Sequence, residues 1–190
     1  SGAVLLYALL AFLALALMSY SQTDPSLSTA AGPVVENWMG RAGALVAERV
    51  LLFFGLISAL FLPLLYAFAR KLWRDGSDEE TMAGGKWWRT VLVLLVAMVL
   101  LSTVIALVTN PREWSLPAGL GGLAGLFGES GIRALAGLLP EAARFWAILG
   151  AGFACLVGGA VLSGRVFAID WATLLTLPDW LKRPPALTRE

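Results

Sequence analysis

The chain contains no histidine and only one cysteine, Cys155. Without histidine it cannot form a Ser-His-Asp or Cys-His nucleophile pair or an HExxH zinc site, and it lacks the commonest general base. A single cysteine forms neither an internal disulfide nor a CxxC pair for a metal or redox centre. The sequence therefore predicts no catalytic residue, no cofactor and no metal site within these 190 residues.

Charge is the second thing the sequence has little of. Charged residues make up 14% of the chain, whereas a soluble domain carries roughly a quarter. The 14 Lys and Arg residues almost balance the 13 Asp and Glu residues, which excludes both a basic nucleic-acid surface and an acidic tail. Apolar residues reach 58% and the mean hydropathy is +0.78. This composition predicts a protein of the lipid bilayer.

Four long stretches carry no charge, and about 20 helical residues cover the 30 Å or so of a bilayer's hydrocarbon core. The predicted fold is therefore an all-α membrane protein, a four-transmembrane-helix bundle over residues 1–164. A cytoplasmic interfacial helix is expected at 165–180, where Phe167 and Trp171 begin an apolar stripe, and a linker at 181–190. Pro63 is expected to kink the second span. The spans lie at about 2–23, 49–69, 89–110 and 144–164.

Two further apolar segments are expected outside the spans. Trp114–Gly128 is uncharged but short and rich in glycine, which predicts a loop on the outer membrane surface. Between Pro33 and Val46, apolar residues recur with a helical period, which predicts an interfacial amphipathic helix.

The distribution of basic residues predicts the orientation. Nine of them fall in the 70–89 connection and in the tail after residue 164, and five fall in the other connections. Because loops rich in lysine and arginine stay in the cytoplasm, both termini are expected to be cytoplasmic.

Away from the ends of the spans, the ionisable groups are Tyr7, Tyr66 and Cys155, all neutral at physiological pH. The lack of a buried carboxylate or arginine argues against a proton-coupled transporter but leaves a passive pore possible at a subunit interface. In the fourth span, Gly150, Ala154 and Gly158 recur every four residues and predict a helix-packing face, either within the monomer or between subunits. The Leu- and Val-rich third span is expected to face lipid.

The order of motifs resembles a known family. After the first span come Asp24-Pro25-Ser26 and then Asn37-x-x-Gly40-x-x-Gly43, followed by Leu52-Phe53-Phe54-Gly55 at the second span. Gly121-Gly122-x-x-Gly125 lies between spans three and four. This arrangement is similar to the amino-terminal four-helix membrane region of the FtsK/SpoIIIE DNA translocases, over roughly Leu10 to Trp171.

The resemblance implies a function for the fragment. In that family the region anchors the protein in the bacterial inner membrane and brings it to the division septum, and a linker joins it to a hexameric ATPase that moves DNA. No GxxxxGK[ST] motif is present here, so DNA and ATP would be partners only through a missing carboxy-terminal motor. The fragment is expected to bind membrane lipid, other division proteins and copies of itself. The alternative is a small polytopic transporter or channel subunit, and an enzyme acting on membrane-embedded substrates is a remote third reading.

Overall fold

The computed structural model describes residues 2–24, 35–74, 87–109 and 116–167. These residues form an all-helical fold without a strand, as predicted. Three stretches are long and apolar enough to cross a membrane, namely Gly40–Arg70, Trp88–Val108 and Glu141–Val166, while the first helix is shorter. The elements are α1 (Gly2–Met18), α2 (Gly40–Phe54), the 3-10 segment η1 (Gly55–Leu60), α3 (Phe61–Arg74), α5 (Trp87–Val108), α6 (Gly122–Gly137) and α7 (Glu141–Val166).

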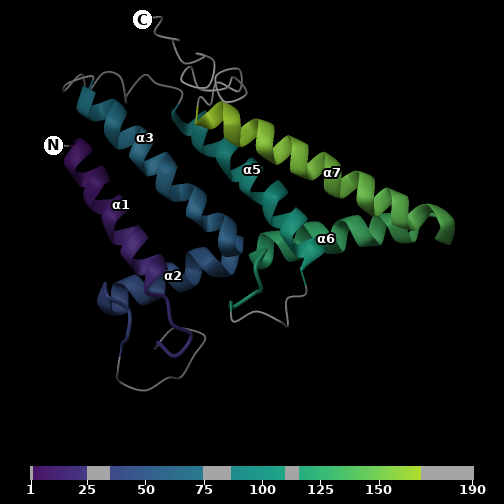
Figure 1. Ribbon diagram of the computed structural model, residues 1–190, viewed down its shortest axis with the longest axis horizontal. Helices are drawn as coiled ribbons and strands as arrows, with labels where there is room; N and C mark the ends of the chain where they lie inside the picture. Colours follow the sequence, from purple (N-terminus) through teal and green to yellow (C-terminus); the bar gives the residue numbers. More distant parts are fainter. Residues whose placement is uncertain (1, 25–34, 75–86, 110–115, 168–190) are drawn as a thin grey trace, which may run out of the picture.

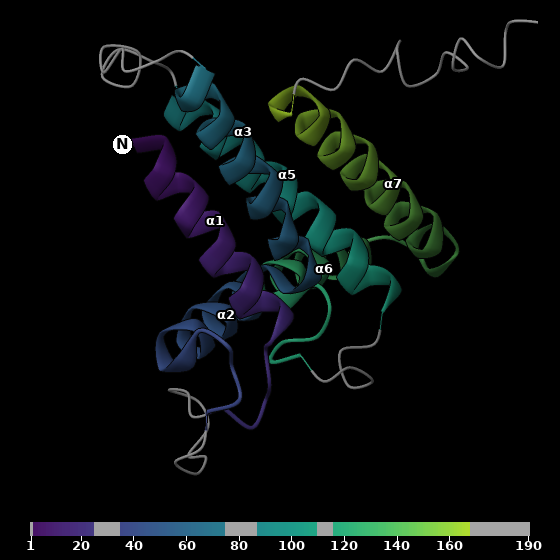
Figure 2. The ribbon, with the colours of Figure 1, turned by 60° about the vertical axis from the view of Figure 1, so that its left-hand side comes forward.

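The helices form two antiparallel pairs and a crossing layer. α1 packs against α3, and α5 packs against α7 (Figure 1). α2 and α6 lie across one end of these pairs and contact each other there, an arrangement we call the α2–α6 layer (Figures 1 and 2). The start of α1 and the end of α3 lie at the opposite end.

A small apolar core joins the two pairs. Leu64 of α3 packs with Leu94 and Met98 of α5, and all three side chains are buried. Phe54 and Phe61 contact this core and meet edge to face, with ring centroids 5.8 Å apart. Because edge-to-face ring pairs add to the stabilisation from burial, this cluster holds α3 onto α5.

The prediction that the third span faces lipid is wrong. α5 is the central helix: a third of its most apolar 18-residue window is buried, against 6% for α7. Its buried residues include Ala97, Ser102, Thr103 and Ala106. In lipid, close packing rather than hydrophobicity decides which helices associate, so a Leu- and Val-rich sequence does not reveal which face points inward.

The second predicted span bends at a glycine. Gly55 has φ +56° and ψ −139°, a conformation that only glycine adopts readily. It ends α2, and the chain turns there into η1 and α3 (Figure 1). The kink predicted from Pro63 is therefore misplaced. Pro63 lies in the first turn of α3. The residues before α3 are wound as a 3-10 helix, which accommodates the proline ring and its lack of an N–H.

Two segment predictions need correction. Of the loop predicted at 114–128, residues 116–121 are turns, but α6 begins at Gly122 and runs well past residue 128. The interfacial helix predicted from Pro33 begins only at Gly40, because Gly40 has φ +64° and an α-helix cannot continue through that conformation. The helix predicted for 165–180 lies outside the described residues from 168 onward, and so does the linker predicted at 181–190. Pro25 and Ser26 of the family motif also lie outside the described residues.

The bend provides the first test. Replacing Gly55 with alanine places a Cβ against the carbonyl oxygen of Leu120 and into a strained backbone conformation. We expect Gly55→Ala to destabilise the fold by about 3 kcal/mol, measured as thermal unfolding in detergent micelles. Gly131→Ala is the matched control, because its Cβ meets no atom within 4 Å and alanine favours a helix by up to about 1 kcal/mol. Equal melting temperatures for the two variants would contradict the role assigned to the bend.

Candidate functional site

The family-motif residues gather at two junctions in the α2–α6 layer. The first, which we call the Asn37 junction, joins the end of α1 to the start of α2. The second, which we call the glycine junction, joins the bend at Gly55 to α5 and the start of α6.

At the Asn37 junction one buried amide organises the backbone. Asn37 is 4% exposed, and its Nδ2 donates hydrogen bonds to the carbonyl oxygens of Ala16, at 2.9 Å, and Ser19, at 3.3 Å. Its Oδ1 accepts a hydrogen bond from the Met39 amide at 3.0 Å. Ala16 belongs to the last turn of α1, whose carbonyls lack helical partners. Asn37 therefore caps α1 from a position 21 residues further along the chain.

Neighbouring residues complete the same junction. Ser19 Oγ donates to the Leu15 carbonyl at 2.6 Å and accepts from the Trp38 amide at 3.0 Å. Gly43 has no room for a side chain, because an added Cβ would overlap Asn37 Oδ1 and the Met39 Cβ. Gly40, by contrast, has open space and is needed for its positive φ. The glycines predicted from the motif thus have two separate roles.

Acidic groups lie buried beside this junction. Asp24 is 2% exposed, and its Oδ1 accepts a hydrogen bond from the Glu36 amide at 2.6 Å. Glu48 of α2 is 4% exposed. Tyr20 lies two residues beyond α1, where burial, the charge of Glu48 and the charge of Asp24 together raise the pKa of its hydroxyl. Tyr20 therefore stays neutral at physiological pH.

At the glycine junction, backbones approach one another directly. The Leu56 amide donates to the Leu120 carbonyl at 2.8 Å. Gly122 has φ +62°, and a Cβ there would lie 2.5 Å from the Gly55 nitrogen. A Cβ on Gly121 would lie 2.6 Å from the Ser102 carbonyl oxygen. Ser102 in turn donates its hydroxyl to the Phe54 carbonyl at 3.2 Å, so α5 contacts both the bend and the start of α6.

Sequence reasoning missed several members of this junction. Ser102 and Thr103 carried no signal of their own in the sequence, and Gly128 was assigned to a loop. A Cβ on Gly128 would overlap the Thr103 side chain, and one on Gly125 would overlap the Ser102 carbonyl. The spacing of Gly121, Gly125 and Gly128 by four and then three residues is the small-residue pattern of close helix packing, and it could have revealed α6.

The helix-packing face predicted on α7, Gly150, Ala154 and Gly158, contacts the rest of the described chain only in part. A Cβ added to Gly158 would lie 3.3 Å from Leu100 Cδ1. By contrast, a Cβ added to Gly150 would have no neighbour within 4 Å, and Ala154 is exposed. The closest approach of α7 to α5 is instead at Gly159, where a Cβ would lie 2.7 Å from Leu101 Cγ.

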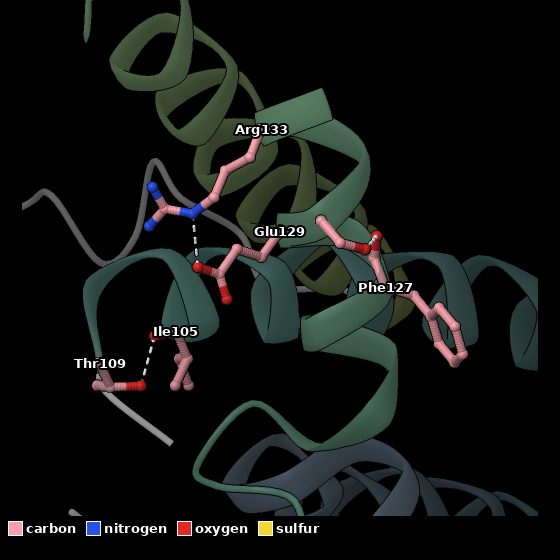
Figure 3. A network of polar contacts seen from close by, with 6 residues as sticks. Ile105, Thr109, Phe127, Glu129 and Arg133 are labelled. Carbon is pink, nitrogen blue, oxygen red and sulfur yellow. Dashed lines mark hydrogen bonds and ion pairs between the residues drawn. The ribbon is translucent and has the colours of Figure 1, made fainter. Parts of the chain in front are cut away.

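α6 carries an ion pair at its surface. Arg133 Nε and Glu129 Oε1 form an ion pair at 2.7 Å, while Phe127 extends from the other side of the helix (Figure 3). Between α5 and α7 a cavity of about 290 Å³ has an entirely apolar lining that includes Val104, Ile148 and Phe153. Within the described ranges no group of three or more Cys, Asp or Glu side chains could hold a metal ion.

Comparison with known proteins agrees with the motifs. Residues 1–175 match the family described as the 4TM region of DNA translocase FtsK/SpoIIIE. The chain is 31% identical over 168 residues to the DNA translocase FtsK of Vibrio vulnificus, covering 88% of this chain and 16% of that protein. It is 30% identical over 162 residues to that of Caulobacter vibrioides, covering 84% and 17%. It thus spans less than a fifth of these relatives. No solved structure matches it.

The Asn37 junction yields the second test. Asn37→Ala leaves two carbonyls and one amide without their partner, so we expect a loss of about 2 kcal/mol in the free energy of unfolding. Ser130→Ala is the control, because it removes one exposed hydrogen bond on α6. It should change the free energy of unfolding by less than about 0.5 kcal/mol. Thermal or denaturant unfolding in detergent measures both.

A charge variant gives this test a pH dependence. In Asn37→Asp, the carboxylate cannot donate to the Ala16 and Ser19 carbonyls, so burial raises the pKa of the new carboxyl in the folded state. The penalty is therefore largest at neutral pH, and its charge-dependent part disappears below about pH 4, near the unfolded value. A smaller loss remains there, because a protonated carboxyl can donate to only one of the two carbonyls. A penalty independent of pH would contradict the donor role of Asn37.

Proposed function

Because the chain belongs to the FtsK/SpoIIIE family of DNA translocases and matches its four-transmembrane region, we propose that it anchors such a translocase in the bacterial inner membrane and brings it to the division septum. The observation that carries this proposal is the match over residues 1–175. The matched part is the membrane region and not the ATPase motor, so no enzyme activity is expected of these residues. DNA and ATP are then partners of the remainder of the protein, in which chromosome segregation would be coupled to division.

The α2–α6 layer is the part of the fold best suited to recognition of other division proteins. Two helices lie across the ends of the spans, and loops join them to α1 and α5. The layer is held in shape by the Asn37 and glycine junctions, so its surface is preorganised and costs little ordering on binding. This rigidity supports the layer as the docking face.

The basic residues support an orientation in which this layer faces outward. Residues 70–89 include five of the Lys and Arg residues. The end of α3 and the start of α5, which flank this connection, lie at the end opposite the α2–α6 layer (Figure 1). With that end in the cytoplasm, the layer lies on the external side and the chain leaves α7 toward the cytoplasm.

The alternative of a transporter or channel subunit has less support. The cavity between α5 and α7 is lined only by apolar side chains, whereas a path for a polar substrate needs polar groups or water along it. The anchor proposal requires no such path.

Self-association through α7 is a further part of the proposal. Gly150 and Ala154 lie on the exposed part of a helix whose neighbours within the chain contact other positions. Small residues at this spacing allow the backbones of two helices to approach closely. Since the described part of this chain does not cover them, we assign Gly150 and Ala154 to contact with a second copy.

The third test follows the protein in cells. A fusion of residues 1–190 to a fluorescent protein that folds only in the cytoplasm should be fluorescent and should concentrate at the division site. An unrelated four-span membrane protein with the same fusion should label the membrane evenly. Even membrane labelling by both the test fusion and the control fusion would count against septal targeting. If the test fusion is expressed normally but is not fluorescent, the orientation is the reverse of the one proposed.

The fourth test separates the faces of α7. Ala154→Leu should leave thermal stability in detergent unchanged and reduce crosslinked oligomers, because Ala154 is exposed. Gly159→Leu should lower stability by about 1–3 kcal/mol, because it overlaps Leu101 and the Ala97 carbonyl. If Ala154→Leu leaves the crosslinked oligomers at their original level, the face contacts lipid.

A further inference from the structure

α2 presents one face to the protein and leaves the other uncovered. Its buried residues are mostly small, including Gly43, Ala44 and Ala47, and they let the helix lie close beneath the end of α1. Its one acidic residue, Glu48, lies on this buried face at 4% exposure. The exposed face of α2 therefore carries positive charge only.

That exposed face consists of two parallel stripes. Arg41, Leu45 and Arg49 follow one another at intervals of four residues, and all three are exposed. Beside them run Ala42, Val46 and Phe53, with Phe53 52% exposed. A helix that lies flat at the boundary of water and hydrocarbon has this pattern, with cationic and apolar residues side by side. Trp38, 66% exposed, precedes the helix and is typical of the same boundary.

Nothing in the described ranges neutralises these two arginines. Arg133 pairs with Glu129, and Arg144 donates to the carbonyls of Leu139 and Gly137. Neither Arg41 nor Arg49 has an ion-pair or hydrogen-bond partner in the part of the chain that the structure describes. Eight residues apart on a helix, the two α-carbons are separated by about 12 Å along its axis.

We propose that this face of α2 binds anionic phospholipid headgroups. Arg41 and Arg49 contact the phosphates, for which a guanidinium is a well-matched bidentate donor. Val46 and Phe53 lie toward the acyl chains. Charge complementarity selects this occupant, because an apolar surface alone would accept any lipid, whereas two unpaired arginines favour headgroups with net negative charge. The proposal does not depend on septal targeting or on the orientation of the layer.

The test uses the purified full chain in neutral detergent, with dioleoyl phosphatidylglycerol and dioleoyl phosphatidylcholine as probes. Bound lipid is counted by native mass spectrometry, and thermal stability is measured with each lipid. We expect phosphatidylglycerol to be retained in preference to phosphatidylcholine. Each arginine should contribute about fivefold to this preference, so the Arg41→Gln, Arg49→Gln double variant should lose roughly 25-fold. Inorganic phosphate at the same concentration should not stabilise the protein.

Matched variants keep the outcome specific. Arg133→Gln removes the same charge from a paired arginine and should retain most of the preference. Arg41→Lys with Arg49→Lys keeps the charge and should lose less than the glutamine pair. Without lipid, the double glutamine variant should unfold at the original temperature, because neither side chain makes a contact that holds the fold.

Three results would overturn the proposal. One is equal retention of the two lipids by the original chain. Another is an equal loss in the Arg133→Gln control, which would indicate a general charge effect. The last is a change in oligomeric state of the double variant with lipid binding unchanged, which would assign this face to a second copy of the chain.

Discussion

The direct backbone contact between Gly55 and Gly122 is the constraint on which the rest of the fold depends. It places the end of α2 against the start of α6, and the Leu56 amide closes the contact by donating to the Leu120 carbonyl at 2.8 Å. A Cβ on either glycine would lie within 2.8 Å of backbone atoms of the opposite segment. Because backbone cannot move aside as a flexible side chain can, the contact requires glycine on both sides. The two crossing helices are thereby joined to each other through backbone contact.

Small residues, rather than charge or size, then decide which spans lie together. Ser102 of α5 faces Gly121 and Gly125, and Ala97 faces Gly159 of α7. In lipid there is no hydrophobic gain when one apolar helix meets another, so close van der Waals contact decides the arrangement. This is why α5 is central although it is the most apolar of the three long spans, and why α7 contacts the bundle along one narrow face. The large apolar side chains of α7, such as Phe145 and Phe153, are exposed and suit a lipid environment.

Polar groups are concentrated where the helices end, and this links the fold to its proposed role. Asn37 binds a backbone carbonyl that the end of α1 leaves without a helical partner, and Asp24 accepts a hydrogen bond from the Glu36 amide ahead of α2. These bonds shape a layer of two crossing helices and leave one side of it free. A membrane anchor that brings a motor to one place needs such a fixed surface. α2 contributes both stripes of it, one apolar and one carrying Arg41 and Arg49.

The sequence by itself determined the helical membrane class and the family, because these depend on local hydropathy and on motif order. It also indicated that Asn37, Gly40, Gly43, Gly121 and Gly122 matter. Only the tertiary structure decided what they do, since Asn37 caps a helix 21 residues away and Gly122 begins a helix instead of lying in a loop. The direction in which Ala154 faces, and the central place of α5, were likewise undetermined. Such features depend on contacts between distant segments, and in an apolar chain the hydropathy of a residue does not distinguish a protein neighbour from lipid.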